Sequence, residues 1–204
     1  MPHTPSNPAQ IGWQATSFSL PEPLTGKTVT LAEARGDKAT LVAFISNVCP
    51  FVKLIEKSLV QFAADYKNRG LRVIAINSNA QEIKAGEDAE GVAKAAREGN
   101  YGFPYLRDET QTVAEAYGAA CTPDLYLLDG AGHLFYRGQF DAARPGNGIA
   151  PSGADLRAAA DALLSGAAAP ARQTPSIGCN IKWRDGDDHG VRKAASPQRP
   201  RLVA

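Results

Sequence analysis

The feature that most constrains the fold is a buried-strand pattern that runs directly into an amphipathic helix. TLVAFI (40–45) is a continuous apolar run of strand length, which is typical of a strand covered on both faces. In PFVKLIEKSLVQFAADYKNRG (50–70), apolar residues recur at helical spacing, and Gly70 stands where a C-cap glycine belongs. LRVIAINS (71–78) supplies a second apolar strand. Strands of this kind need helices on their faces, which favours an α/β domain.

The rest of the periodic region continues the alternation. After 71–78 the pattern predicts, in order, a helix near 88–98, a short strand and turn at 103–109, a short helix at 110–118, antiparallel strands at 125–129 and 133–140, and a helix at 154–166. Two strand–helix units followed by a hairpin and a terminal helix predict a three-layer α/β/α domain with a central mixed β-sheet.

Composition divides the chain into segments. Residues 1–15, with three prolines, are expected to form a flexible N-terminal lead, and residues 16–167 carry the periodic domain. Residues 184–204 are polar and rich in Arg and Pro, so we expect a disordered tail. Between them, residues 168–183 are expected to dock on the domain as a C-terminal extension through three apolar side chains, Ile177, Ile181 and Trp183.

Charge and cysteine content limit the function classes. The formal net charge is +1, which gives no reason to expect binding to nucleic acid or to an anionic membrane. No apolar stretch approaches bilayer length, and the N-terminus lacks the pattern of a signal peptide. Three cysteines are too few for a disulfide framework, which favours a reducing cytoplasm.

One cysteine stands at the junction of the first strand and its helix. Cys49 faces the unpaired backbone N–H groups and the positive end of the helix dipole, and both stabilise a thiolate. Pro50 suits the first helical position, and Lys53, one turn on, adds electrostatic support. The alternative is that Cys49 is a small buried core residue, because free cysteine is often fully buried.

At these residues the sequence resembles a known family. FISNVCPFVKLIEKSLVQFAADY (44–66) is similar to the active-site strand and helix of thioredoxin-fold proteins, with Cys49 in the place of the attacking cysteine. FSLPEPLTGKTVTLAEARGDKATLVAF (18–44) resembles the start of the AhpC/TSA (redoxin, peroxiredoxin-like) branch. GAACTPDLYLLDGAGHLFYRGQFD (118–141) resembles its second half, with Pro123 at the cis-proline position.

The resemblance covers residues 12–184 and is most specific for a single-cysteine bacterial subgroup. Its motifs are CPFVK, INSN, GFPYL, ACTPD, RGQFD, RPGNG and SIGCNIKW. The resemblance implies a thioredoxin-like fold and a redox-active Cys49. It also implies a cis bond between Thr122 and Pro123, and pairing of the Thr122 backbone with a bound substrate strand.

Compared with peroxiredoxins, the sequence lacks two groups. Ser46 and Cys49 match the Thr/Ser-x-x-Cys portion of the peroxidatic motif, in which the hydroxyl binds the peroxide. The proline expected ahead of them is Val42, and the activating arginine would fall near Pro123, where none stands. Compared with thioredoxins, Val52 replaces the second cysteine and Ala43 the buried acid. Key groups of both mechanisms are therefore missing.

The other two cysteines are candidate resolving thiols. Cys121 lies in the Cys-Thr-Pro loop, which packs against the active-site cysteine in thioredoxin folds, or it is simply a small apolar residue. Cys179 is either a resolving thiol docked near the helix start or a packing residue of the tail. Any cysteine that can reach the Cys49 sulfur can resolve a mixed disulfide formed there.

The sequence therefore favours a thiol-dependent oxidoreductase with antioxidant activity. Cys49 attacks a peroxide or disulfide, and Cys121, Cys179 or an external thiol, such as thioredoxin or glutathione, regenerates it. No cofactor, metal, nucleic acid or membrane partner is expected.

The alternative is a non-catalytic module that holds a thiol ligand or metal, or that senses oxidation. A copper site is disfavoured because Lys53 takes the place of its second cysteine and His133 stands alone. A glutathione-held iron–sulfur cluster has little support. Asn77 and Asn79, at the end of a predicted strand, are read as turn residues, with ligand contact as the alternative.

Overall fold

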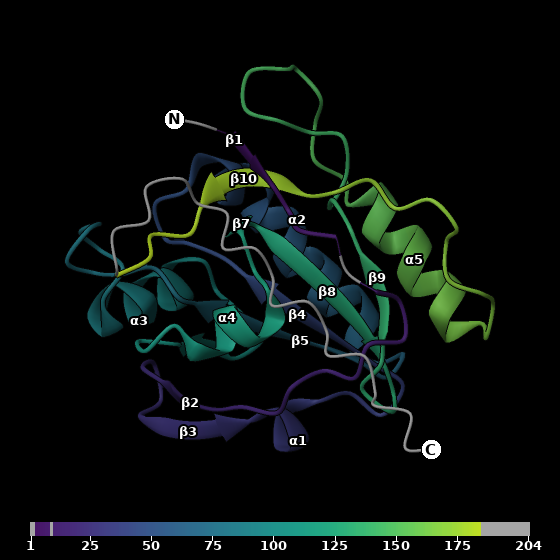
Figure 1. Ribbon diagram of the computed structural model, residues 1–204, viewed down its shortest axis with the longest axis horizontal. Helices are drawn as coiled ribbons and strands as arrows, with labels where there is room; N and C mark the ends of the chain where they lie inside the picture. The colour runs from purple at the N-terminus through teal and green to yellow at the C-terminus, as the bar shows by residue number, and fades with distance from the viewer. Residues whose placement is uncertain (1–2, 9, 185–204) are drawn as a thin grey trace, which may run out of the picture.

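A mixed β-sheet forms the centre of the molecule (Figure 1). The computed structural model describes residues 3–8 and 10–184. Strand order is β6-β5-β4-β8-β9. The first three strands are parallel to one another, β8 is antiparallel to β4, and β9 is antiparallel to β8. The bounds are β4 (Ala39–Phe44), β5 (Leu71–Asn77), β6 (Tyr105–Arg107), β8 (Asp124–Asp129) and β9 (Leu134–Arg137). The expected α/β class with a mixed sheet is confirmed.

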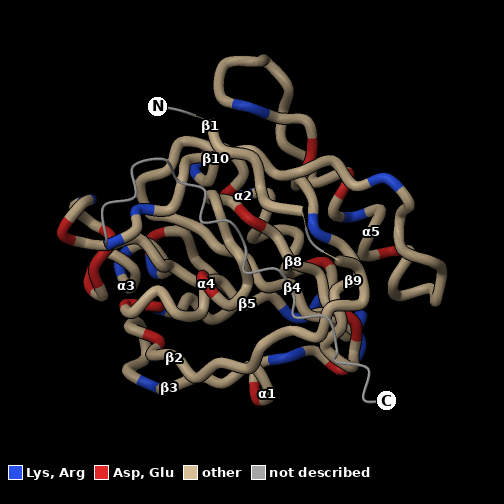
Figure 2. The backbone as a smooth tube through the Cα atoms, in the orientation of Figure 1, with Lys and Arg blue, Asp and Glu red and all other residues tan. Residues whose placement is uncertain are grey.

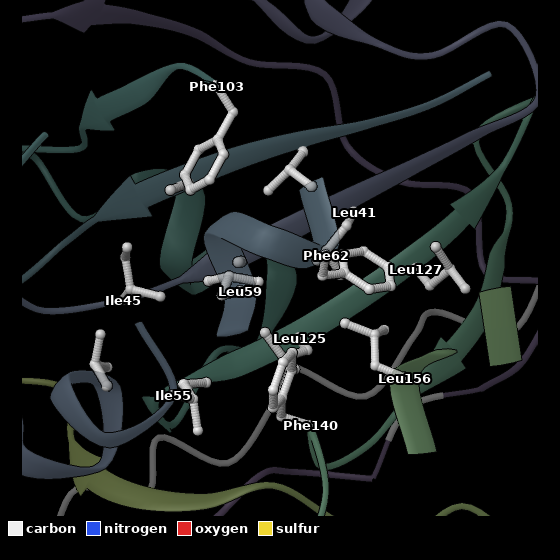
Figure 3. Packing of buried hydrophobic residues seen from close by; sticks show 14 of the residues in the cluster. Leu41, Ile45, Ile55, Leu59, Phe62, Phe103, Leu125, Leu127, Phe140 and Leu156 are labelled. Atoms are coloured by element: carbon white, nitrogen blue, oxygen red, sulfur yellow. The ribbon is translucent and has the colours of Figure 1, made fainter. Parts of the chain in front are cut away.

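The longer helices pack on one face of this sheet. They are α2 (Pro50–Lys67), α3 (Ala89–Glu98) and α5 (Ala154–Leu164). Side chains alternate along β4, so Leu41 points to this face while Val42 points to the opposite one. Figure 3 shows Leu41 and Phe62 packed together, with Leu125 and Leu156 in the same cluster. Phe62 is fully buried and contributes about 2–3 kcal/mol of apolar burial, which ties α2 to the sheet.

The opposite face is covered by shorter elements. They are the β2–β3 hairpin (Ser19–Glu22 and Lys27–Thr30), α1 (Leu31–Ala34) and α4 (Thr112–Tyr117). Tyr117 meets the rings of Phe44 and Tyr126 at centroid distances of 5.6 and 5.4 Å. The sequence patterns did not identify the hairpin or α1, since both are short and largely exposed.

A second, smaller sheet joins both ends of the described chain. It has the order β1-β10-β7, with β1 (His3–Pro5), β10 (Ile177–Asn180) and β7 (Cys121–Thr122), all antiparallel. Figure 1 places β1 and β10 beside one end of α2. The expectation of a flexible lead at residues 1–15 is therefore wrong for residues 3–5. Local sequence could not reveal this strand, because the paired residues are 172 to 176 positions apart in the chain.

The segment expected to dock on the domain, residues 168–183, contains β10, and Ile181 and Trp183 are buried in the core beyond it. Of the tail expected to be disordered, residues 185–204 lie outside the described residues.

Charged residues lie mainly on helices and loops around the sheet. Figure 2 shows acidic and basic positions interspersed along these outer elements, in keeping with the net charge of +1. None of the helices in the described part of the chain is both long and apolar enough to cross a membrane.

Candidate functional site

Cys49 lies at the point where the loop after β4 becomes α2. Its backbone is extended (φ −76°, ψ 122°), so it is the N-cap, and Pro50 takes the first helical position as expected. The side chain is 2% exposed. In its thiol form it donates a hydrogen bond to the backbone oxygen of Thr122, with Sγ and O 3.1 Å apart. The thiol therefore rests between a helix start and the β7 loop.

Cys179 reaches the same place from the C-terminal segment. In the ladder of β10 and β7 it lies directly opposite Thr122. The residue is 7% exposed, it lines the same cavity as Cys49, and its thiol interacts with that of Cys49. Two cysteines that are 130 positions apart in the chain thus meet beside the start of α2.

Hydrogen bonds to the Cys49 sulfur favour its thiolate. They lower the pKa of Cys49 to about 6, and the largest cause is the bond from the Cys179 thiol. Burial opposes the shift, while smaller contributions come from the Thr122 hydroxyl and from the backbone N–H groups of Val52 and Cys179. The buried Thr122 hydroxyl has no hydrogen-bond partner among the described residues, so it is available to a thiolate at Cys49. The same bond raises the pKa of Cys179, which is the proton donor of the pair.

Cys121, the other candidate resolving thiol, faces away from this pair. It precedes Thr122 in β7, and successive residues of a strand point to opposite sides. It is fully buried, and its thiol donates to the backbone oxygen of Pro123 with Sγ and O 3.5 Å apart. Burial raises the pKa of the Cys121 thiol, with a further contribution from the nearby Asp124 carboxylate. Cys121 is therefore neither exposed nor activated.

The loop that carries Thr122 continues through a cis bond to Pro123. Asp124, the next residue, is fully buried and receives two hydrogen bonds from the Arg137 guanidinium, at 2.9 and 3.3 Å. Burial raises the pKa of Asp124, and Arg137 counteracts the rise. An arginine thus stands behind the loop, contributed by β9, but its guanidinium is directed at Asp124.

The Ser46 hydroxyl, expected to bind a peroxide, instead donates a hydrogen bond to the buried carboxylate of Glu87. Glu87 also accepts from Asn77 at 2.6 Å, from Asn79 at 2.9 Å and from the backbone N–H of Asn47 at 3.1 Å. With four donors, both carboxylate oxygens are satisfied. This arrangement fixes the loop that leads to Cys49.

Sequence reasoning missed Glu87 and read Asn77 and Asn79 as turn residues. Asn79 additionally accepts from the backbone N–H of Lys182 at 2.8 Å, which holds the chain just beyond β10. The Arg107 guanidinium supports the same turn through the backbone oxygens of Asn77 and Asn79. The only sequence signal was the Asn-Ser-Asn at the end of β5. Nothing in the polar stretch around Glu87 marks it as buried.

Lys53 does not support the thiolate as expected. Its ammonium pairs with Glu56 at 3.0 Å, and its side chain is 47% exposed. The opposite charge of Glu56 offsets that of Lys53 at the sulfur. Activation of Cys49 therefore comes from hydrogen bonds and not from a neighbouring cation.

A small cavity opens on the thiol pair. Its volume is about 50 Å³, and Ser46, Cys49, Lys84, Cys179 and Lys182 are among its lining residues. Val48, 41% exposed, also lines it. In the described residues, no three His, Cys, Asp or Glu side chains gather as a metal-ion site would require.

The fold is thioredoxin-like, with a cysteine at the start of its first long helix and a cis-proline loop against it. The chain belongs to the AhpC/TSA family, whose model matches residues 11–137, more than half of its length. It is 28% identical over 126 residues to the thiol-disulfide oxidoreductase ResA of Halalkalibacterium halodurans, covering 62% of this chain and 66% of that protein. This chain thus matches just under two thirds of that relative's length.

Two solved structures are more similar to this chain in sequence than ResA is. A hypothetical protein from Sinorhizobium meliloti 1021 is 54% identical, with a TM-score of 0.87, over 90% of this chain and all of that one. An uncharacterised conserved protein from Geobacillus kaustophilus is 48% identical, with a TM-score of 0.88, over 90% of this chain and 97% of that one. The thioredoxin domain of a thiol-disulfide oxidoreductase from Bacteroides vulgatus (21% identity, TM-score 0.54, 64% and 89% coverage) shares the fold alone.

Proposed function

We propose that the protein is a thiol-dependent oxidoreductase in which Cys49 is the nucleophile and Cys179 the resolving thiol. The observation that carries this proposal is the position of Cys179: it lies opposite Thr122, whose backbone oxygen is 3.1 Å from the Cys49 sulfur, and both cysteines line the same cavity. The interaction between the two thiols also lowers the pKa of Cys49 and raises that of Cys179. A nucleophile should be a thiolate at neutral pH, and its partner should hold a proton until it is needed. Membership of the AhpC/TSA family and the likeness to ResA support the same class.

With a peroxide, the Cys49 thiolate attacks the terminal oxygen. An S–O bond forms, the O–O bond breaks, and the alcohol or water leaves after taking up a proton, so that Cys49 becomes a sulfenic acid. The Cys179 sulfur then attacks the Cys49 sulfur, hydroxide leaves as water with the Cys179 proton, and a Cys49–Cys179 disulfide remains. The peroxide has received two electrons from the thiol pair.

With a disulfide, the first product is a mixed disulfide between Cys49 and one half of the substrate. The other half leaves as a thiolate. Attack by Cys179 on Cys49 releases the second half and again leaves the Cys49–Cys179 disulfide. Two equivalents of an external thiol, such as glutathione, or one molecule of thioredoxin, return both cysteines to the thiol form and become a disulfide themselves.

Cys121 has no step in this proposal. Its thiol points away from the pair and bonds to Pro123, and burial raises its pKa. The distinction between Cys121 and Cys179 is what makes the proposal testable.

The test is mass spectrometry of the purified protein after hydrogen peroxide or a small disulfide, comparing wild type with Cys49→Ser, Cys179→Ser and Cys121→Ser. We expect wild type and Cys121→Ser to form a Cys49–Cys179 bridge. Cys179→Ser should stop at a Cys49 sulfenate or mixed disulfide, and Cys49→Ser should not react. A Cys49 that stays a thiol under these conditions, or a bridge that contains Cys121, contradicts the proposal.

A further inference from the structure

The strand that carries Cys179 also fills the edge of β7. Cys179 pairs with Thr122, and Asn180 with Cys121, in antiparallel register. A free strand edge is a site at which an extended polypeptide can add by backbone hydrogen bonds. Here that edge, beside the reactive thiol, is occupied by the chain itself. From this position on β10, Cys179 lines the same cavity as Cys49.

The approach of β10 to this loop depends on Gly178. A Cβ atom at this position would lie 2.0 Å from the backbone oxygen of Thr122, 2.6 Å from its carbonyl carbon and 3.1 Å from the nitrogen of Pro123. All three are backbone atoms, so they cannot move aside as a flexible side chain would. Any residue other than glycine would push β10 away from the loop.

β10 is held in place on both sides of its cysteine. Before it, the Ser176 hydroxyl donates a hydrogen bond to the backbone oxygen of Gly138, with the two oxygens 3.1 Å apart. After it, the backbone N–H of Lys182 donates to Asn79, and Ala80 N–H donates to the Lys182 oxygen at 2.8 Å. The other edge of β10 is paired with β1, where His3 lies opposite Cys179.

With β10 in place, the access to Cys49 is limited to the small cavity. Its volume of about 50 Å³ is of the order of one or two small molecules the size of water or hydrogen peroxide. The exposed Val48 and the side chains of Lys84 and Lys182 line this space. A slender disulfide end can approach the sulfur here, whereas an extended backbone has no unpaired strand edge to join.

We propose that β10 is a built-in occupant of the substrate-strand position, and that Gly178 thereby restricts Cys49 to small oxidants and excludes disulfides held in extended polypeptides. This inference rests on the proposed function, since it specifies the substrate class of the same cysteine. Selectivity arises because a competing strand must first displace β10 from Thr122.

The test compares two substrates with the same reacting bond. One is the mixed disulfide of 2-mercaptoethanol with N-acetylcysteine amide, and the other is the same disulfide within an extended peptide. Rates of modification of Cys49 are measured by mass spectrometry in wild type, in Gly178→Ala and in Gly102→Ala. Gly102 has open space for a Cβ and an ordinary φ, so it is the matched control.

Wild type and Gly102→Ala should react with the small disulfide at least about tenfold faster than with the peptide. Gly178→Ala should reduce this preference to about threefold or less by accelerating the peptide reaction. Equal rates for both substrates in wild type, or an unchanged preference in a folded Gly178→Ala, would overturn the inference.

A second measurement does not depend on the variant. Hydrogen exchange of residues 177–180 in wild type should be the same with and without excess peptide whose cysteine is replaced by serine. Loss of protection in β10 on addition of this peptide means that the strand site is available, and overturns the inference. Treatment with hydrogen peroxide distinguishes failure of the two proposals. If peroxide cannot oxidise Cys49, the proposed function is refuted. If peroxide oxidises Cys49 normally but the peptide disulfide also reacts fast with wild type, only the role of β10 is refuted.

Discussion

The hydroxyl of Ser46 donates its hydrogen bond to the carboxylate of Glu87, a residue 41 positions further along the chain that has no exposed surface. This contact ties the loop before the reactive cysteine to the turn after β5. The same carboxylate satisfies the side-chain amides of Asn77 and Asn79. A single buried acid therefore sets the position of the loop on which Cys49 depends.

Glu87→Gln should destabilise the protein by about 2 kcal/mol. The glutamine NH₂ group would face the amide donors of Asn77 and Asn79, so buried donors would be left without an acceptor. Chemical denaturation measures this. Glu98→Gln, at a position 67% exposed, is the control and should change stability by less than about 0.5 kcal/mol. Equal stability of the two variants would mean that the Glu87 contacts are not needed.

Replacing Cys179 should raise the pKa of Cys49 above about 6, because the largest stabilising hydrogen bond is lost. The rise should be about one unit or more in Cys179→Ala and smaller in Cys179→Ser, which keeps a donor. Thr122→Val should produce a lesser rise. Ultraviolet absorbance of the thiolate against pH gives each value, with Cys121→Ala as a control that leaves the titration in place. An unchanged pKa in Cys179→Ala would remove the basis for pairing these thiols.

The alkylation rate of Cys49 should rise with pH around a midpoint near 6 and level off above about pH 7, since the thiolate is the nucleophile. An ordinary cysteine would still be gaining reactivity near pH 8.5, roughly its unperturbed pKa. Iodoacetamide labelling resolved by mass spectrometry follows each cysteine separately. Cys121, buried and with a raised pKa, serves as the internal reference and should label slowly throughout.

The contribution of Cys49 to the free energy of unfolding should also increase as the pH rises. The folded pKa of Cys49 lies below its unfolded value, so its contribution is fully present above the unfolded pKa and is lost as pH falls through about 6. Cys179 stays protonated in the folded state over this window, because its folded pKa is raised, and its titration in the unfolded state is common to wild type and Cys49→Ser. The free energy of unfolding of wild type, minus that of Cys49→Ser, should therefore grow between about pH 6 and 8.5. A difference that is flat or shrinks contradicts this sign.

Arg137→Met should be strongly destabilising, by about 3–5 kcal/mol, because it leaves the carboxylate of Asp124 buried without its partner. The double variant Asp124→Asn with Arg137→Met should recover part of the loss. Arg69→Met is the matched control: its pair with Asp161 is about half exposed, and its removal should cost less than about 1 kcal/mol. Thermal or urea unfolding distinguishes them.

How much of this the sequence could predict depends on the range of each interaction. β4 and α2 are encoded by local periodicity, and Cys49 is identifiable because its setting, a strand end followed by Cys-Pro, is contiguous in the chain. The cis bond at Pro123 was expected from the resemblance of residues 118–141 to the AhpC/TSA family. These predictions required no knowledge of how distant segments meet.

Cys179 and Glu87 depend on contacts that no local pattern contains. Cys179 stands in a short apolar island, and only the pairing of β10 with β7 decides between a resolving and a packing position. Glu87 follows a glycine in a polar connection that reads as solvent-exposed, and its burial results from four donors that converge from other segments. Lys53 was misjudged because its partner, Glu56, also lies on the helix and competes for the ammonium.

The pairing of β1 with β10 has a practical consequence for work on this protein. His3 lies opposite Cys179, and its ring meets that of Phe51, in the first turn of α2, at a centroid distance of 5.0 Å. The amino-terminal strand thus packs against the strand and the helix turn that carry Cys179 and Phe51, next to the nucleophile. An affinity tag or fusion partner placed ahead of this strand is tethered beside the reactive sulfur, so kinetic comparisons require it to be cleaved off or moved to another position.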